Sequence, residues 1–275
     1  MTATAGATPG PIVVTATVGS LSATFNLTSR LPGPQLSAPG FQNGASFEQG
    51  AVPGGIVTIF GAGIAPTLRG VSSPSQVVGP LPTELSGVSV TFNDVAAPIY
   101  SVSNIDGTEA VTVQVPFETA PGQATVRVNV SGGNSTMTVP VQAVQPGIFE
   151  TGTQGTRFAV AQRPDGTFVS PTNPARRGET IRFYATGLGQ VTAATGTNRA
   201  GIPNQRVNAN IIVGLNYEGA PLVSAEYAEG MIGVYVITFQ IPSNAPAGSA
   251  IPLNMAAVAP DGQSVFSRDS NIAIQ

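Results

Sequence analysis

Apolar and polar residues alternate in short runs along the whole chain, and most runs end at a glycine or a proline. Alternation with a period of two places one kind of side chain on one face of a β-strand, whereas amphipathic helices repeat near every 3.6 residues. No stretch keeps the helical period. Short strands separated by turn signals about every 8–12 residues are typical of a β-sandwich. The pattern therefore predicts an all-β chain.

The first pair of runs lies at residues 12–18 and 21–27, joined by Gly19-Ser20, which predicts a β-hairpin. A lone hairpin is only marginally stable in water, so we expect it to pack on something. The proline-rich stretch at 31–40 is expected to be a stiff linker. The residues of the expected apolar face, the candidate assembly strand, are Ile12, Val14, Ala16, Val18, Leu21, Ala23, Phe25 and Leu27.

Two larger sets of strands follow the linker. The first set is expected at 55–61, 87–93, 97–103, 110–116, 124–131 and 135–143, with a polar loop at 64–81 and a turn or short helical crossover at 117–122. The second is expected at 207–215, 220–228, 233–242, 251–259 and 264–274. We predict three parts: a hairpin and linker at 1–36, one sandwich at 37–147 and a second at 148–275.

One stretch occurs twice, which indicates a duplicated domain. Gly54-Gly-Ile-Val-Thr-Ile-Phe-Gly-Ala-Gly63 returns as Gly178-Glu-Thr-Ile-Arg-Phe-Tyr-Ala-Thr-Gly187: a turn glycine, an alternating strand, an aromatic residue and a glycine kink. The distance between the copies is that of a small domain. A phosphate-binding loop would need a helix after the glycines, and none is predicted. We interpret the glycines as kinks that mark the fold. They are Gly61, Gly63, Gly187 and Gly189.

Several motifs together resemble a known family. They are Gly54–Ile64, Leu81–Asn93, Pro146–Phe149 and Asn173–Glu179 followed by Tyr184–Gly189. In combination they resemble an uncharacterised C-terminal domain family of acidobacterial secreted proteins, and each half resembles immunoglobulin-like domains of the IPT/TIG type. The N-terminal hairpin resembles the last strands of a preceding bacterial immunoglobulin-like repeat. The resemblance implies two tandem immunoglobulin-like β-sandwiches and an exported setting, and it brings no catalytic residues.

The composition excludes much chemistry. The 275 residues include no Cys, His or Trp, and all 11 cationic side chains are Arg. Ordinary zinc, copper, haem and iron–sulfur sites need Cys or His, as do Ser-His-Asp and Cys-His catalysis. The net charge of −3 gives no basic footprint for nucleic acid. No apolar run approaches the ~18–20 residues of a membrane helix. No cofactor or metal is expected.

A few polar residues are candidates for chemistry. Glu226 and Glu229, near Tyr227, could act as the carboxylate pair of a glycoside hydrolase, but we interpret them as solvated loop charges. Three acidic turns could offer oxygens to Ca²⁺, yet none has the required spacing, and we expect plain turns. These turns lie at Asp106–Glu109, Asp165-Gly166 and Asp261-Gly262. The candidate sugar-stacking residues, which we expect to pack in the core or at edges instead, are Tyr100, Tyr217, Tyr227 and Tyr235.

Only 9% of the residues are charged, against about 25% in a typical soluble domain. Strand positions expected to face outward are neutral, among them Thr112, Gln114, Thr136 and Thr138. Charged edges normally prevent strands from pairing between molecules, so neutral ones suit assembly. We therefore predict a non-enzymatic bacterial extracellular or cell-surface module, structural or adhesive, that polymerises into a filament by strand addition through the hairpin. The alternative is a carbohydrate- or surface-binding module of a larger secreted protein. An enzyme ranks third.

Overall fold

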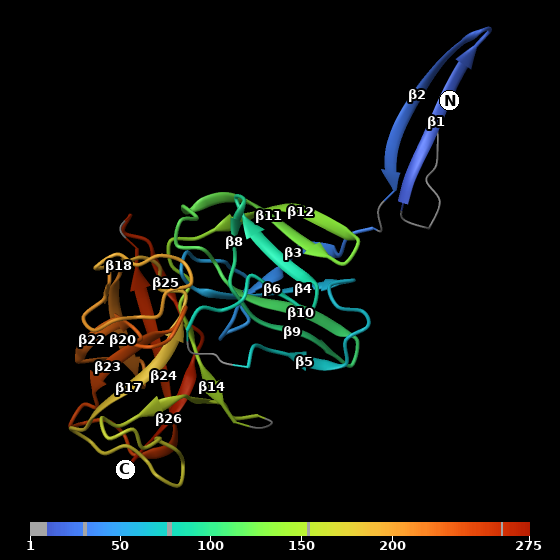
Figure 1. Ribbon diagram of the computed structural model, residues 1–275. Coiled ribbons are helices and arrows are strands. Elements are labelled where there is room, and N and C mark those ends of the chain that lie inside the picture. Colours follow the sequence, from blue (N-terminus) through green and yellow to red (C-terminus); the bar gives the residue numbers. More distant parts are fainter. Residues whose placement is uncertain (1–9, 30–31, 76–78, 153–154, 260) are drawn as a thin grey trace.

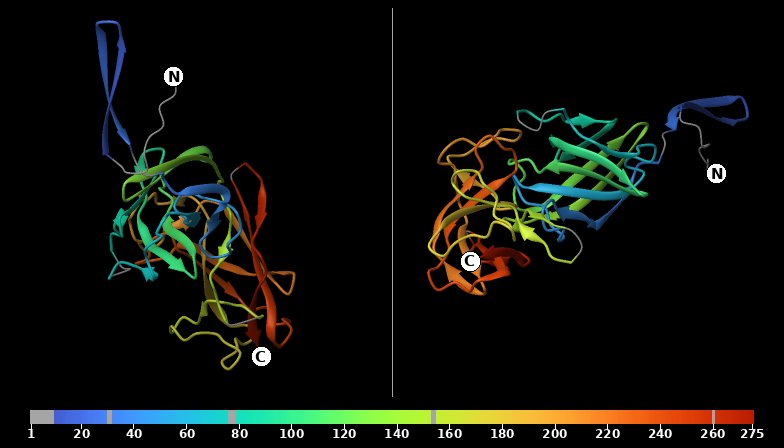
Figure 2. Two further views of the ribbon diagram at one scale, coloured as in Figure 1. Left: turned by 90° about the vertical axis from the view of Figure 1, so that its right-hand side faces the viewer. Right: turned by 90° about the horizontal axis from the view of Figure 1, so that it is seen from below.

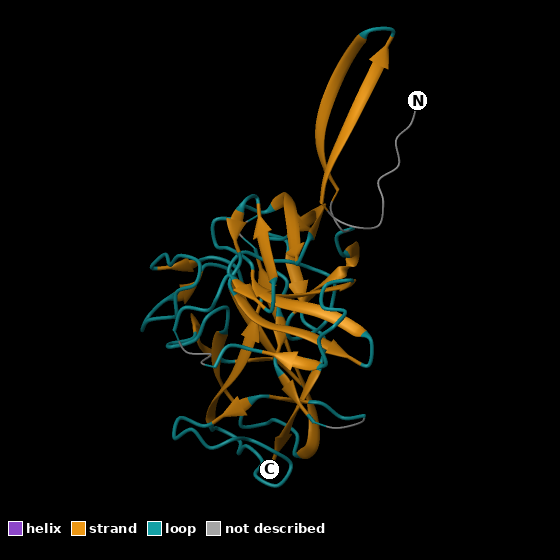
Figure 3. Ribbon diagram, turned by 45° about the vertical axis from the view of Figure 1, so that its right-hand side comes forward, coloured by secondary structure: helices purple, strands orange, loops and turns teal. Residues whose placement is uncertain are grey.

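The structure, a computed structural model, describes residues 10–29, 32–75, 79–152, 155–259 and 261–275. These residues form strands, turns and loops without a helix (Figure 3). They fold into a hairpin followed by two tandem immunoglobulin-like β-sandwiches (Figure 1). The predicted fold is therefore confirmed. Within the described ranges, no helix is long and apolar enough to cross a membrane.

The N-terminal hairpin consists of β1 (Gly10–Val18) and β2 (Leu21–Ser29). The strands pair along their whole length, from Gly10 opposite Ser29 to Val18 opposite Leu21. The ribbon projects away from the two sandwiches in every view (Figures 1 and 2). Its side chains are consequently among the most exposed of the molecule.

The first sandwich packs two sheets, ordered β3-β4-β10-β9-β5 and β12-β11-β7-β6, with β8 paired to β7. Alternation directs Val57, Ile59 and Val111 of one sheet toward Val90 and Val126 of the other, and all five are buried. The strands are β3 (Gln35–Asn43), β4 (Ile56–Ala62), β5 (Gly70–Ser72), β6 (Glu84–Leu85), β7 (Val88–Phe92), β8 (Val95–Ala96), β9 (Ile99–Ile105), β10 (Thr108–Gln114), β11 (Gly122–Val130) and β12 (Gly133–Val141).

Two expected loops contain strands at sheet edges. The prediction of a linker throughout 31–40 was wrong, because β3 begins at Gln35 and pairs with β4. The register of this pair shifts between Leu36 and Phe41, so Pro39 lies where its missing N–H removes no ladder bond. The expected loop at 64–81 likewise contains β5, which pairs with β9. Edge strands have one partner, and their sequence pattern is correspondingly weak.

The second sandwich packs the sheet β13-β17-β23-β22-β19-β18, with β16 paired to β17, on the sheet β21-β20-β24-β25, with β26 paired to β24. Phe183 and Phe239 meet edge to face in its core, with ring centroids 5.7 Å apart. The strands are β13 (Gly147–Ile148), β16 (Ala161–Gln162), β17 (Thr180–Thr186), β18 (Val191–Thr192), β19 (Arg206–Val207), β20 (Asn210–Leu215), β21 (Glu218–Ala220), β22 (Leu222–Tyr227), β23 (Tyr235–Gln240), β24 (Gly248–Val258), β25 (Ser264–Phe266) and β26 (Ser270–Ile274), and β14 (Glu150–Thr151) pairs with β15 (Phe158–Ala159) beside them.

A buried polar network joins the two sandwiches. Gln114 was expected on an outer face, but its side chain is fully buried at this joint. Its Nε2 donates to Tyr227 OH at 3.1 Å and to Gly54 O at 3.3 Å, and its Oε1 accepts from Asn198 N at 2.8 Å. Thr186 Oγ1 adds a second link, since it accepts from Ile56 N at 2.8 Å. The sandwiches therefore share a specific interface.

The repeated glycines end the matching strands β4 and β17, and one of them also forms the joint. Gly187 lies in the left-handed region at φ 79° and packs against Gly55. A Cβ at position 187 would lie only 2.1 Å from Gln145 O. Gly63 has a similar φ of 85° but more room, with Pro34 Cα at 3.5 Å from a Cβ built there. Glycine at 187 is thus required both by the backbone and by the close approach of the sandwiches.

Candidate functional site

The first candidate site is the apolar side of the hairpin, here called the ribbon face. Cross-strand partners share a face, and the register pairs Ile12 with Leu27, Val14 with Phe25, Ala16 with Ala23 and Val18 with Leu21. All eight residues predicted for the assembly strand therefore lie on one face of the ribbon: Ile12, Val14, Ala16, Val18, Leu21, Ala23, Phe25 and Leu27. Whether they serve assembly stays a prediction.

Most of the ribbon face is open to solvent, and only Ile12 and Val14 are half-buried. Val18 is 81% exposed, Leu21 77% and Phe25 54%. The opposite face is mostly polar, with Thr15 opposite Thr24 and Thr17 opposite Ser22. Neither strand contains a charged residue. Contiguous exposed apolar surfaces are typical of interaction sites.

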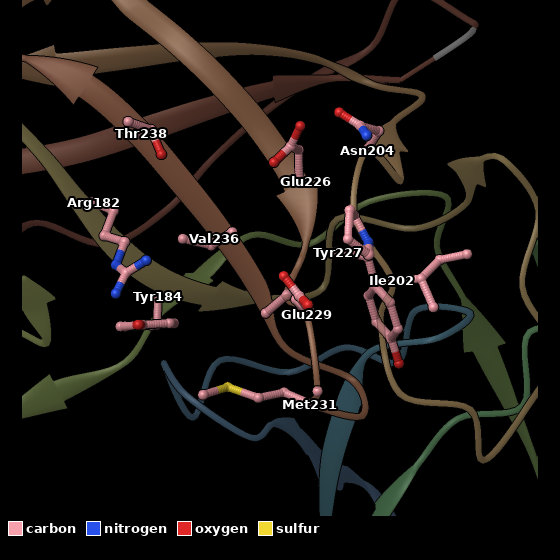
Figure 4. Close-up of a pocket in the computed structure, with 13 residues that line it drawn as sticks. Arg182, Tyr184, Ile202, Asn204, Glu226, Tyr227, Glu229, Met231, Val236 and Thr238 are labelled. Atoms are coloured by element: carbon pink, nitrogen blue, oxygen red, sulfur yellow. The ribbon is translucent and has the colours of Figure 1, made fainter. Parts of the chain in front are cut away.

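The second candidate site is a groove on the outer face of the second sandwich, here called the sheet groove (Figure 4). Tyr184 of β17 lies opposite Val236 of β23, which lies opposite Glu226 of β22, so the three strands contribute one row. The groove encloses about 670 Å³. Its other lining residues are Arg182, Ile202, Pro203, Asn204, Tyr227, Ala228, Glu229, Gly230, Met231 and Thr238.

The two walls of the sheet groove carry opposite charges. Arg182 and Tyr184 lie on one side and Glu226 and Glu229 on the other, with Val236 between them (Figure 4). Gln162 fixes the first wall, because its Oε1 accepts from Tyr184 OH at 2.7 Å and from Arg182 Nη2 at 3.3 Å. Arg182 Nε is buried and has no hydrogen-bond partner among the described residues. Glu226 and Glu229 form no ion pair with the described residues.

The structure changes the interpretation of the acidic pair. Glu226 belongs to β22 and faces the groove rather than lying in a loop, whereas Glu229 does lie in the loop after that strand. Sequence analysis missed Arg182 and Tyr184. Both alternate along β17 with the buried Ile181 and Phe183, so their outward direction was readable from the sequence. Which residues lie beside them on the neighbouring strands could not be predicted from the sequence.

The tyrosines predicted to pack internally mostly do so. Tyr227 and Tyr235 are buried and meet edge to face, with ring centroids 5.2 Å apart. Burial raises the pKa of Tyr227 to about 12 and raises that of Tyr235 well above its ordinary value. Tyr100 donates to Ile232 O across the joint, and burial, together with Tyr227, raises its pKa strongly. Only Tyr217 of the four is open, at 70% exposure.

The acidic turns form local hydrogen bonds. Asp106, at φ 51°, stands in the turn between β9 and β10. Asp165 Oδ1 accepts from Thr167 N at 2.9 Å, and Asp261 Oδ1 accepts from Gln263 N at 3.0 Å. These bonds are typical of aspartate turns. Across the described residues, no three Asp or Glu side chains gather as a metal site would need.

No protein-family model matches the chain, and no characterised protein matches its sequence. Several solved structures align with this chain, two of them of tandem immunoglobulin domains. Domains I67–I69 of titin align at 10% identity and a TM-score of 0.21, over 82% of this chain and 61% of that one. The Ig1-2 module of the Drosophila receptor protein tyrosine phosphatase DLAR aligns at 12% identity and a TM-score of 0.20, over 88% and 99%. Domains 4–9 of the surface layer protein SbsC align at 13% identity and a TM-score of 0.24, over 97% of this chain and 35% of that one. The chain thus spans less than two thirds of the titin and SbsC structures.

Proposed function

We propose that this protein is a non-catalytic structural or adhesive module of the bacterial cell exterior, and that it joins to further copies through the ribbon face. The observation that carries this proposal is that eight apolar residues lie on one face of an uncharged ribbon, six of them exposed and two half-buried. The low charge of the whole chain and the resemblance to secreted tandem immunoglobulin-like domains support the same setting.

The ribbon can recruit a partner in two ways at once. Its apolar face gains about 25 cal/mol for each Å² that a neighbour covers. The outer edges of β1 and β2 each pair with no further described strand, so the edge of β1 and the edge of β2 over residues 21–28 can add to another sheet. When the donor and acceptor surfaces differ, the contact need not close into a ring, and a filament results.

Light scattering of the full chain and of a variant lacking residues 1–31 tests this proposal. We expect high-mass species from the full chain and a monomer from the deletion variant. Val14→Asp, on the ribbon face, should abolish assembly, because it puts a charge in the interface. Thr15→Asp is the matched control on the opposite face and should still assemble. A full chain that stays monomeric, or that assembles equally well with Val14→Asp, contradicts the proposal.

A second function, binding of a glycan or another surface ligand, is favoured by one observation. The sheet groove places an arginine, a tyrosine and two carboxylates around one hollow, and the carboxylates form no ion pair within the described part of the chain. The two functions use different parts of the molecule and can coexist in an adhesive module.

A further inference from the structure

We infer that the sheet groove binds a neutral polyhydroxylated ligand, the chemical class of an uncharged sugar chain. This inference rests on the second proposed function and specifies its site. The groove's volume of about 670 Å³ lies within the ~300–1,000 Å³ range of small-ligand sites.

The distribution of charge in the groove favours a neutral ligand. An anion beside Arg182 would also meet Glu226 and Glu229, and a cation beside the carboxylates would meet Arg182. A hydroxyl group both donates and accepts hydrogen bonds. A ligand with several hydroxyls can therefore donate to the carboxylate wall and accept from the arginine wall without bringing a charge that one of the walls repels. Hydrogen bonds with one charged partner are also the stronger kind.

The apolar parts of the groove suit the C–H faces of a sugar ring. Tyr184 is partly exposed, and its bond to Gln162 holds the phenol in place. Val236 forms the floor of the groove, while Ile202 and Met231 at its rim are 58% and 42% exposed. Aromatic and aliphatic surface beside charged hydrogen-bonding groups is the combination that an amphipathic ring can use.

The strands that form the groove are fixed from behind. Glu226 and Tyr227 are neighbours in β22 and point to opposite faces, so the groove residue sits on a strand that Tyr227 anchors in the joint. Tyr227 OH accepts from Gly233 N at 2.5 Å and donates to Arg199 O at 3.2 Å. A site held on packed strands needs little reorganisation when a ligand binds.

Affinity gel electrophoresis tests the inference, with soluble neutral polysaccharides (a β-glucan, a xylan and a mannan) beside anionic polygalacturonate and cationic chitosan. We expect retardation by at least one neutral polymer and by neither charged one. Tyr184→Ala and the isosteric Glu226→Gln should each weaken the retardation by about tenfold or more. Tyr217→Ala is the matched control, since Tyr217 is exposed in the turn between β20 and β21, away from the groove.

Two further measurements make the result decisive. Unfolding midpoints show whether the variants fold. If Tyr184→Ala does not fold, Glu226→Gln still tests the inference. The variant lacking residues 1–31 should bind the polysaccharide like the full chain, so failure of assembly and failure of binding are distinguishable. Absence of binding to every neutral polymer, preference for a charged polymer, or unchanged binding by both groove variants overturns the inference.

Discussion

The hairpins β1–β2 and β11–β12 have the same local design and different surroundings. Each has two strands of nine residues joined by a two-residue turn. Val14 and Val126 are both the fifth residue of a first strand that begins with glycine. Val126 is fully buried against the facing sheet of its sandwich, whereas the face that contains Val14 is open. Alternation in the sequence is thus sufficient to form a ribbon. Whether its apolar face is buried depends on another part of the chain, or another molecule, that packs against it.

The sandwiches contain buried tyrosines and the ribbon contains none. We therefore predict that alkaline pH strongly lowers the stability of the sandwiches. Tyr100, Tyr227 and Tyr235 have raised pKa values in the folded chain, while β1–β2 contains no titratable side chain. A tyrosine is neutral when protonated, so this contribution to stability is complete below the unfolded pKa of 10 and is lost as the pH rises toward 12 and beyond. Over this pH range, each buried tyrosine lowers the free energy of unfolding by up to about 1.4 kcal/mol per pH unit.

Near-ultraviolet absorbance of tyrosinate, recorded with circular dichroism during an alkaline titration, measures this effect. We expect three tyrosines to ionise only together with unfolding of the sandwiches. Ionisation of all five tyrosines near pH 10 in a chain that stays folded would contradict it.

The same charge placed on the two hairpins should have very different costs. Val126→Asp buries an unpaired carboxylate in the first sandwich and should lower the free energy of unfolding by about 4 kcal/mol. Val14→Asp at the equivalent position of the ribbon should change it by less than about 0.5 kcal/mol in a monomeric sample, because solvent already reaches that face. Urea denaturation measures both variants. Equal losses would mean that the ribbon face is covered within the monomer.

The repeated glycines allow a similar comparison. Gly63→Ala should cost about 1 kcal/mol, because alanine tolerates the left-handed conformation poorly and the space is otherwise free. Gly187→Ala should cost about 3 kcal/mol, because the new Cβ also overlaps Gln145 O and separates the sandwiches. Thermal unfolding of the two variants gives the difference. Similar midpoints would show that the joint adapts easily.

The sequence indicates what depends on neighbours along the chain and misses what depends on distant ones. Alternation at 12–18 and 21–27 predicted the ribbon and its face, and the repeated glycines indicated the duplication. Gln114 looked like an outward neutral residue, because its partners at 198 and 227 are far away in the sequence. The groove was missed for the same reason: Tyr184, Val236 and Glu226 become a row only through the strand registers.

The joint between the sandwiches gives the finest test of the comparison, since it is the buried counterpart of the exposed ribbon. Gln114→Ala removes this partner from Tyr227 OH, Gly54 O and Asn198 N, and the loss of three buried hydrogen bonds should cost about 2 kcal/mol in total. We expect calorimetry to resolve one unfolding transition of the wild-type sandwiches into two in this variant, because the coupling between them weakens. Gln123→Ala, at an exposed position of β11, should keep a single transition at the wild-type midpoint. Two transitions already present in the wild type would show that the network does not couple the sandwiches, and that they are as independent of each other as the ribbon is of both.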